Sequence, residues 1–192
     1  MFKPICTAPP EDMPVTLAEA KAHLHVDSAS KDGMIGALLA AAAAKFDGYA
    51  GTLGRCLVTQ KWLAAYESWP ECGDIRLPFP DVAKEGLELT YIDVNEVEQT
   101  VAQEFYELLE DELGAFVRLG EYFRAPTLSD DQSDVVRVAF MAGYGDPEKV
   151  PGDIKAAIII WMKYLYRPDL YDLKTITMVV ESLTARYSRV GA

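Results

Sequence analysis

Hydrophobic residues recur at helical spacing in the first quarter of the chain and predict two helices. Thr16 and Glu19 have the spacing of a capping box, so we expect a first helix from Thr16 to about His25. A second helix is predicted over residues 31–49. Its apolar stripe consists of Ile35, Leu38, Leu39, Ala42, Phe46 and Tyr49. Alanines, among them Ala40 and Ala44, cover its other sides, and such small residues let another helix approach closely.

Between residues 55 and 144 the apolar positions alternate instead, which predicts strands. The first strand carries Val58, Gln60, Trp62, Ala64 and Tyr66 on one side. A short strand follows near Pro78, and two hairpins are expected with turns at 93–96 and 110–114. A last strand is predicted over residues 135–142, with Val136, Val138 and Phe140 on one side.

The segment that follows, residues 151–166, predicts a helix with almost no polar face. Ile154, Ile158, Trp161 and Leu165 form one face, and Ile159, Met162 and Tyr166 form another. Such a helix must be buried, yet a chain of 192 residues has few elements to cover it. We therefore interpret it as a sign of assembly with other copies of the chain.

Together these elements predict an α+β fold, a helical-bundle body of about four helices with a β-rich insertion between the second and third long helices. We divide the chain into an N-terminal helical part of the body (1–54), a β-rich acidic insertion (55–145), a central apolar helix (146–173) and a C-terminal segment (174–192). The C-terminal segment is amphipathic and basic, and is expected either to be helical or to become ordered on contact with a partner.

The net charge of −12 is concentrated in the middle of the chain. Residues 81–134 contain 3 basic and 15 acidic residues, whereas residues 135–192 contain 8 basic and 6 acidic ones. An acidic surface repels phosphate, which disfavours tight binding of nucleic acid by this segment. An ordinary solvated, solubilising surface is the alternative interpretation.

The sequence contains no pattern typical of an active site. His23 and His25 are the only histidines, and a two-residue spacing on a helix does not bring them together for zinc. Cys6, Cys56 and Cys72 form no paired motif, which indicates a reducing compartment. Neither a membrane span nor a secretory signal is evident, so synthesis in the cytoplasm is expected. Glu107 and Glu110 leave an acidic-site hydrolase as a distant alternative.

Five segments, in this order, resemble the head–tail connector (adaptor) family of long-tailed bacteriophages and gene transfer agents. They are PVTLAEAKAHLHVD (14–27), GRCLVTQKW (54–62), the WP and IRLPFPDV pair (69–82), YIDVNEVEQT (91–100), and VRVAFMAGYGDPEKVPGDIKAAIIIWMKYLY (137–166). The resemblance covers nearly the whole chain. One departure is the hairpin turn, where Asn95–Glu96 stands in place of an expected glycine-containing turn.

The resemblance implies a structural virion protein with neither enzymatic activity nor cofactor. Such a protein forms a twelve-subunit ring under the portal, at the head–tail junction of a particle assembled in the bacterial cytoplasm. Its expected partners are other copies of itself, the portal protein, a neck stopper or tail-completion protein, and DNA that passes through the channel without specific binding. A neck stopper or tail-completion protein is the alternative within the particle.

Two sets of residues follow as candidate contacts. The C-terminal segment is expected to dock on the portal, which implicates Lys174, Arg186, Tyr187, Arg189 and Val190. The small and apolar helix faces are expected to contact neighbouring subunits, through Ala40, Ala44, Ile159, Met162 and Tyr166.

Overall fold

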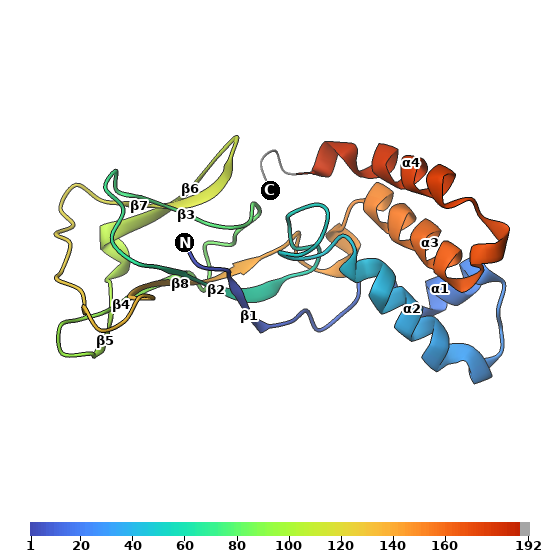
Figure 1. The fold of residues 1–192 in the computed structure, drawn as a ribbon, viewed down its shortest axis with the longest axis horizontal. Helices are drawn as coiled ribbons and strands as arrows, with labels where there is room; N and C mark the ends of the chain where they lie inside the picture. The colour runs from blue at the N-terminus through green and yellow to red at the C-terminus, as the bar shows by residue number, and fades with distance from the viewer. Residues whose placement is uncertain (189–192) are drawn as a thin grey trace. The chain divides into compact units, whose positions relative to one another are not determined.

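The chain forms two compact units, which we call the strand unit and the helical unit. A computed structural model describes residues 1–188, and Figure 1 shows its elements. Residues 1–10 and 59–143 make the strand unit, and residues 11–58 together with those from 144 onward make the helical unit. The α+β fold class is confirmed, since four α-helices and antiparallel sheets are present in the described residues.

The strand unit contains two antiparallel sheets. The larger has the order β1–β2–β8–β4–β5, formed by Ile5–Ala8, Gln60–Tyr66, Val136–Ala142, Glu88–Ile92 and Glu98–Thr100. The smaller has the order β3–β7–β6, formed by Asp74–Arg76, Gly114–Leu119 and Tyr106–Asp111. The predicted alternation holds in the central strands. Trp62 and Ala64 in β2, and Val138 and Phe140 in β8, are buried.

The two expected hairpins are present. In the first, β4 and β5 are joined at Asp93, whose carboxylate accepts hydrogen bonds from the backbone N–H groups of Asn95 (2.8 Å) and Val97 (3.1 Å). Glu96 adopts the left-handed conformation there, with φ 60°. The side chain of Asp93 thus stabilises the turn in which a glycine was expected. The second hairpin joins β6 and β7 through Gly114, at φ 108°.

In the helical unit, α1 (Leu17–Leu24) begins as predicted. The Thr16 side chain accepts from the backbone N–H of Glu19 at 3.2 Å, and the backbone N–H of Thr16 donates to the Glu19 carboxylate at 2.7 Å. The capping box is therefore confirmed. His25 ends the helix in the left-handed conformation.

α2 (Asp32–Ala44) is shorter than the helix predicted over residues 31–49. The carboxylate of Asp47 accepts a hydrogen bond from the backbone N–H of Leu57 at 2.7 Å, and Gly48 has φ 72°. These local contacts divert the backbone from helical geometry. Tyr49, expected at the end of the apolar stripe, is therefore 43% exposed.

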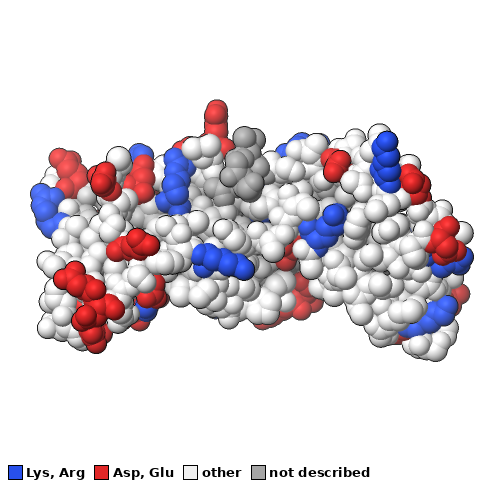
Figure 2. All heavy atoms as spheres, viewed as in Figure 1, with Lys and Arg blue, Asp and Glu red and all other residues white. Residues whose placement is uncertain are grey.

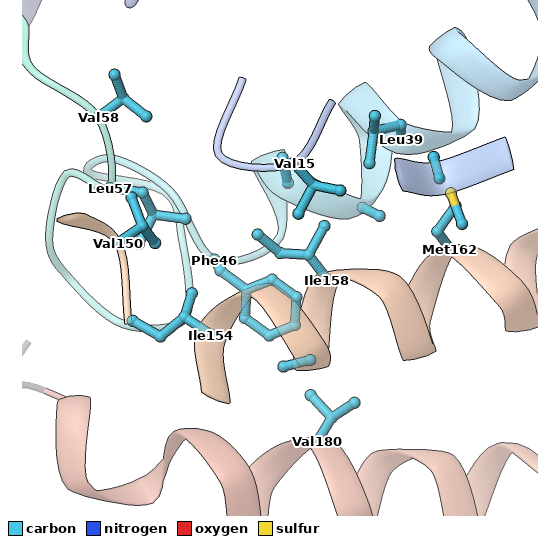
Figure 3. Close-up of a cluster of buried hydrophobic side chains, with 14 of the residues drawn as sticks. Val15, Leu39, Phe46, Leu57, Val58, Val150, Ile154, Ile158, Met162 and Val180 are labelled. Carbon is cyan, nitrogen blue, oxygen red and sulfur yellow. The ribbon is translucent and has the colours of Figure 1, made fainter. Parts of the chain in front are cut away.

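α3 (Gly152–Tyr166) is central to the helical unit and packs against both α2 and α4 (Leu173–Thr184), as Figure 1 shows. Its fully buried residues join Phe46 of the segment after α2, Leu57 and Val180 of α4 in one apolar cluster (Figure 3). Those α3 residues are Ile154, Ala157, Ile158 and Met162. Burial of each of the isoleucine and methionine side chains among them stabilises the fold by roughly 1.5–3 kcal/mol.

Candidate interaction surfaces

The apolar helix α3 is covered largely by its own chain. Met162 is fully buried between the helices, which leaves its side chain no surface for a neighbouring copy. Ile159 and Tyr166 are half-buried, and the Tyr166 hydroxyl lies 3.1 Å from Nζ of Lys31. Lys45 lies over the ring of Trp161, 4.2 Å from its centroid. The helical unit thus accounts for much of the burial that the sequence suggested would need other subunits.

The alanine face of α2 is exposed, in contrast. Both Ala40 and Ala44 are accessible, and so are Ala37 and Ala41. A Cβ atom built on Gly33 or Gly36 would have no neighbouring atom within 4 Å. This face has the small side chains and the free space that close helix packing requires.

A groove of about 650 Å³ lies beside this face, within the helical unit. Its floor is formed by apolar and small residues, namely Met13, Val15, Leu17, Gly36, Leu39 and Ala40. Its rim carries four exposed carboxylates, those of Glu11 and Asp12 before α1 and those of Asp146 and Glu148 before α3. In the described part of the chain, the one cation paired with this rim is Lys149, 3.6 Å from Asp146.

Sequence reasoning missed this groove because its two acidic segments lie more than 130 positions apart in the chain. Each pair of carboxylates is an unremarkable feature of a loop on its own. No pattern in the sequence indicates that the segments before α1 and α3 lie side by side.

The C-terminal candidates divide into three groups. Lys174 is exposed on α4. Arg186 is 70% exposed at its side chain and donates to the carboxylate of Asp153 at the start of α3 and to the hydroxyl of Tyr187, each at 2.5 Å. Tyr187 is half-buried against the helical core. Arg189 and Val190 lie outside the described residues.

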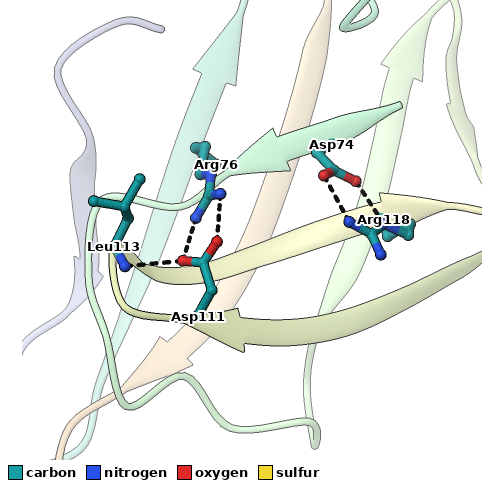
Figure 4. A network of polar contacts seen from close by, with 5 residues as sticks. All are labelled: Asp74, Arg76, Asp111, Leu113 and Arg118. Carbon is teal, nitrogen blue, oxygen red and sulfur yellow. Dashed lines mark hydrogen bonds and ion pairs between the residues drawn. The ribbon is translucent and has the colours of Figure 1, made fainter. Parts of the chain in front are cut away.

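The acidic excess belongs to the strand unit, and Figure 2 shows many of its Asp and Glu side chains on one face. Part of this charge is neutralised locally on the small sheet (Figure 4). Arg76 donates two hydrogen bonds of 2.6 Å to Asp111, and Arg118 binds Asp74 at 2.8 and 2.9 Å. The hydrogen bonds from Arg76 lower the pKa of Asp111 to about 2, and those from Arg118 lower the pKa of Asp74.

These contacts bear on the acidic loop at 107–112. Asp111 is held ionised by its ion pair with Arg76, which gives it a structural role and makes it unsuitable as a general acid near neutral pH. Within residues 1–188, no group of three or more His, Cys, Asp or Glu side chains is arranged to hold a metal ion. None of the helices in the same residues is long and apolar enough to cross a membrane.

An aromatic cluster is the remaining surface feature of the strand unit. Trp69 lies against Tyr91 and Phe123, with ring centroids 5.6 and 5.0 Å away, and its indole N–H donates to the carbonyl of Pro126 at 3.0 Å. The neighbouring Tyr122 is 80% exposed beside a pocket of about 450 Å³. Most of these rings pack on one another, so the cluster serves first to fix the long loop between β7 and β8.

Solved structures of gene transfer agent (GTA) particles contain chains with this fold. One is from the neck of an empty GTA particle computed with C6 symmetry, with a TM-score of 0.80 and 20% identity. A second is from the virion of a native GTA particle, at 0.77 and 21%, and a third from the neck of a native GTA particle computed with C12 symmetry, at 0.73 and 21%. Each match covers 100% of this chain and 97% of the other. At this identity the likeness establishes the fold. No family model and no curated protein matches the sequence.

Proposed function

We propose that this chain is a structural protein of the neck of a phage-like particle, and that it acts there as the head–tail adaptor. The observation that carries the proposal is the likeness over essentially the full length of both chains to proteins from GTA necks and virions. A fold shared over 100% of this chain and 97% of the other favours a shared structural role. The adaptor-like segments of the sequence support the same assignment independently.

In this proposal the protein assembles into a ring of twelve subunits under the portal and joins the DNA-filled head to the neck and tail. The C6 and C12 symmetries of the neck structures that contain similar chains support a ring. The exposed small face of α2, with Ala40 and Ala44, offers a surface for close contact between copies. Ile159 and Tyr166 remain partly accessible for the same purpose.

Docking on the portal is assigned to the C-terminal segment, residues 174–192. Lys174 and Arg186 present positive charge on its exposed side, and Arg189 adds a third cation by sequence. Tyr187 and Val190 complete the proposed contact. Because Arg186 already binds Asp153, docking through its guanidinium would either exchange this ion pair or add to it, as the five N–H donors of arginine permit.

The acidic strand unit is suited to line a channel through which DNA passes without being bound. It contains 7 basic and 18 acidic residues, whereas the helical unit contains 11 and 12. A surface of this sign repels the phosphate backbone, and any contact with DNA would be transient. The proposal thus includes location at the head–tail junction and passage of DNA without specific binding.

A neck stopper or tail-completion protein is the second candidate, because it would occupy the same region and would bind the adaptor in place of the portal. A hydrolase with a site in the acidic loop is less well supported, since the carboxylate of Asp111 already forms an ion pair with Arg76. We accordingly propose that the protein is not an enzyme and needs no cofactor.

The test is binding of the purified full chain to the portal protein of its own particle, followed by electron microscopy of the complex. A ring on the portal is the expected result. Binding to an isolated adaptor ring without binding to the portal would instead favour the stopper. A complete lack of binding to either neighbour, at any concentration that keeps the chain folded, would refute both assignments.

A further inference from the structure

The groove of the helical unit has the chemistry of a receptor for a basic, partly apolar helix. Its rim presents four carboxylates, and among the described residues no ion pair involves Glu11, Asp12 or Glu148. Its floor over Gly36 and Ala40 lacks large side chains, and the space beyond Gly36 is open for at least 4 Å. A ligand that fits would place a long apolar side chain on this floor and cations at the rim.

On the chain itself, α4 and the turn after it carry two exposed cations, Lys174 and Arg186, and one exposed anion, Glu181. On α4 and the turn after it, Lys174, Met178, Ser182 and Arg186 recur every four residues and therefore lie along one side of the helix. All four are exposed, and Met178 is 61% exposed although it is apolar. The opposite side of α4, with Val180 and Thr184, is buried against its own chain.

The two surfaces do not meet within one copy. α3 packs against both α2 and α4 and lies between them in Figure 1, so the α2 groove and the outward side of α4 belong to opposite sides of one helical layer. A contact between them must join two copies. It would be head-to-tail, with different patches on the two partners, and contacts of that kind generate rings when the rotation closes.

We propose that α4 of a second copy of this chain occupies the groove, with Met178 over Gly36 and Ala40. Lys174 would then face the rim carboxylates, and Arg186 would reach them by sharing or exchanging its ion pair with Asp153. Methionine is suited to the site because its flexible side chain fills irregular apolar space. From Lys174 to Arg186, α4 and the turn after it extend about 18 Å, so the two cations are well separated along the groove. Opposite charges at the rim would fix the register and the direction of the contact.

This inference rests on the proposed function, because it specifies how the copies of the proposed ring contact one another. It also changes the roles proposed for residues of the C-terminal segment. Lys174 and Arg186 are assigned to the neighbouring copy, and the residues after Ser188 are left for the portal. Met162, buried in its own core, takes no part.

Cross-linking between two chains that each carry one exposed cysteine tests the direction of the contact. Exposed Cys6 and Cys72 are first replaced by serine, and buried Cys56 is kept. A chain with Ala40→Cys is mixed with a chain carrying Met178→Cys and treated with a short bifunctional thiol reagent, both in free solution at high concentration and on the portal. We expect a mixed dimer in at least one condition. Ala41→Cys, exposed on α2 outside the groove lining, is the matched control.

Charge reversal tests the rim. One variant carries Lys174→Glu and Arg186→Glu, and the other carries lysine in place of all four rim carboxylates, Glu11, Asp12, Asp146 and Glu148. Each variant alone should self-associate at least about tenfold more weakly, because like charges then face one another across the contact. An equimolar mixture should recover association, since every contact between unlike variants again pairs opposite charges. A merely misfolded variant would not be rescued in this way.

The outcomes separate this inference from the proposed function. Cross-linking at Ala41 as efficient as at Ala40, or no recovery in the charge-reversed mixture, would overturn the α4–groove contact even if the protein binds the portal. Efficient and specific cross-linking without any portal binding would support the contact and refute the adaptor role. Dimers joined through Met178 of both copies would replace the head-to-tail contact by a symmetric one.

Discussion

The helical unit and the strand unit differ in their net charge and in how each compensates or buries its side chains. The helical unit is almost neutral, with 11 basic and 12 acidic residues, and it gathers its apolar side chains into one cluster around α3. The strand unit has a net charge of −11, and it balances only part of that charge through ion pairs such as Arg76–Asp111. In the proposed function, the helical unit accordingly carries the surfaces for assembly, and the acidic strand unit repels the phosphates of passing DNA.

The division into two units can be tested most directly by creating a cavity in the core of each unit. Ile158→Ala and Leu89→Ala both truncate fully buried side chains, in the helical and the strand unit respectively, and each should cost about 2–5 kcal/mol of unfolding free energy. Native-state hydrogen exchange then reports where protection is lost. We expect faster exchange in α2–α4 for the first variant and in β2, β4 and β8 for the second. Equal loss of protection throughout the chain in both variants would contradict a division into two units.

A second test concerns the tight turn after α2. A Cβ atom on Gly51 would lie 2.5 Å from the carbonyl oxygen of Asp47, a contact that only a backbone shift can relieve. Gly51→Ala should therefore destabilise the protein by about 1–3 kcal/mol in urea denaturation. Gly33→Ala is the matched control, since nothing lies within 4 Å of its Cβ position, and it should stabilise α2 by roughly 0.5–1 kcal/mol. Equal unfolding midpoints for the two variants would show that the turn relaxes freely.

The capping box provides a smaller local change in the helical unit. Thr16→Ala removes the hydroxyl that accepts from the backbone N–H of Glu19, so the first turn of α1 loses a hydrogen-bond partner. A loss of about 1 kcal/mol is expected in thermal or chemical denaturation. Thr16→Ser retains the hydroxyl and should retain most of the stability. If both variants lose stability to the same extent, the methyl group of Thr16 matters more than its cap.

The smallest expected effect is the acid response of the strand unit. Because Arg76 lowers the pKa of Asp111 to about 2, below the ordinary value of about 3.9, the folded state favours the ionised carboxylate. Its stabilising contribution is present above pH 4 and is lost as the pH falls through 2. The stability difference between the wild type and Asp111→Asn should therefore shrink over this range in denaturation curves.

Glu112→Gln, an exposed neighbour on the same turn, serves as the control. A difference between wild type and Asp111→Asn that stays constant from pH 5 to pH 2 would show that the ion pair with Arg76 does not form in solution.

Most of the elements could be predicted from the sequence because their signals are local. The alternation in β2 and β8, the capping box at Thr16 and the apolar face of α3 each depend on residues close together in the chain. The strand β1, Ile5–Ala8, was not predicted, because as an edge strand it has no buried side to create an alternating pattern. It also brings residues 1–10 into the strand unit, whereas residues 1–54 were all expected to belong to the helical body.

The candidate contacts were predicted less completely, and the reason is packing. The same apolar pattern on α3 is compatible with a face that meets other subunits and with one that meets its own chain. The structure places Met162 in the second class while it leaves Ala40 exposed. The acidic groove was missed altogether, since no local pattern reports that residues 11–12 and 146–148 lie on one rim.

The sequence by itself determined that residues 151–166 contain an apolar helix, because the period of the apolar residues and the proline at the start of this range define it locally. It also determined that the acidic excess belongs to the β-rich part of the chain. Which side of each helix remains uncovered was decided only by the tertiary structure. Burial depends on contacts between distant segments, and α3 lies between α2 and α4 because all three share one core. That arrangement leaves the alanine face of α2 and the outward side of α4 accessible for assembly.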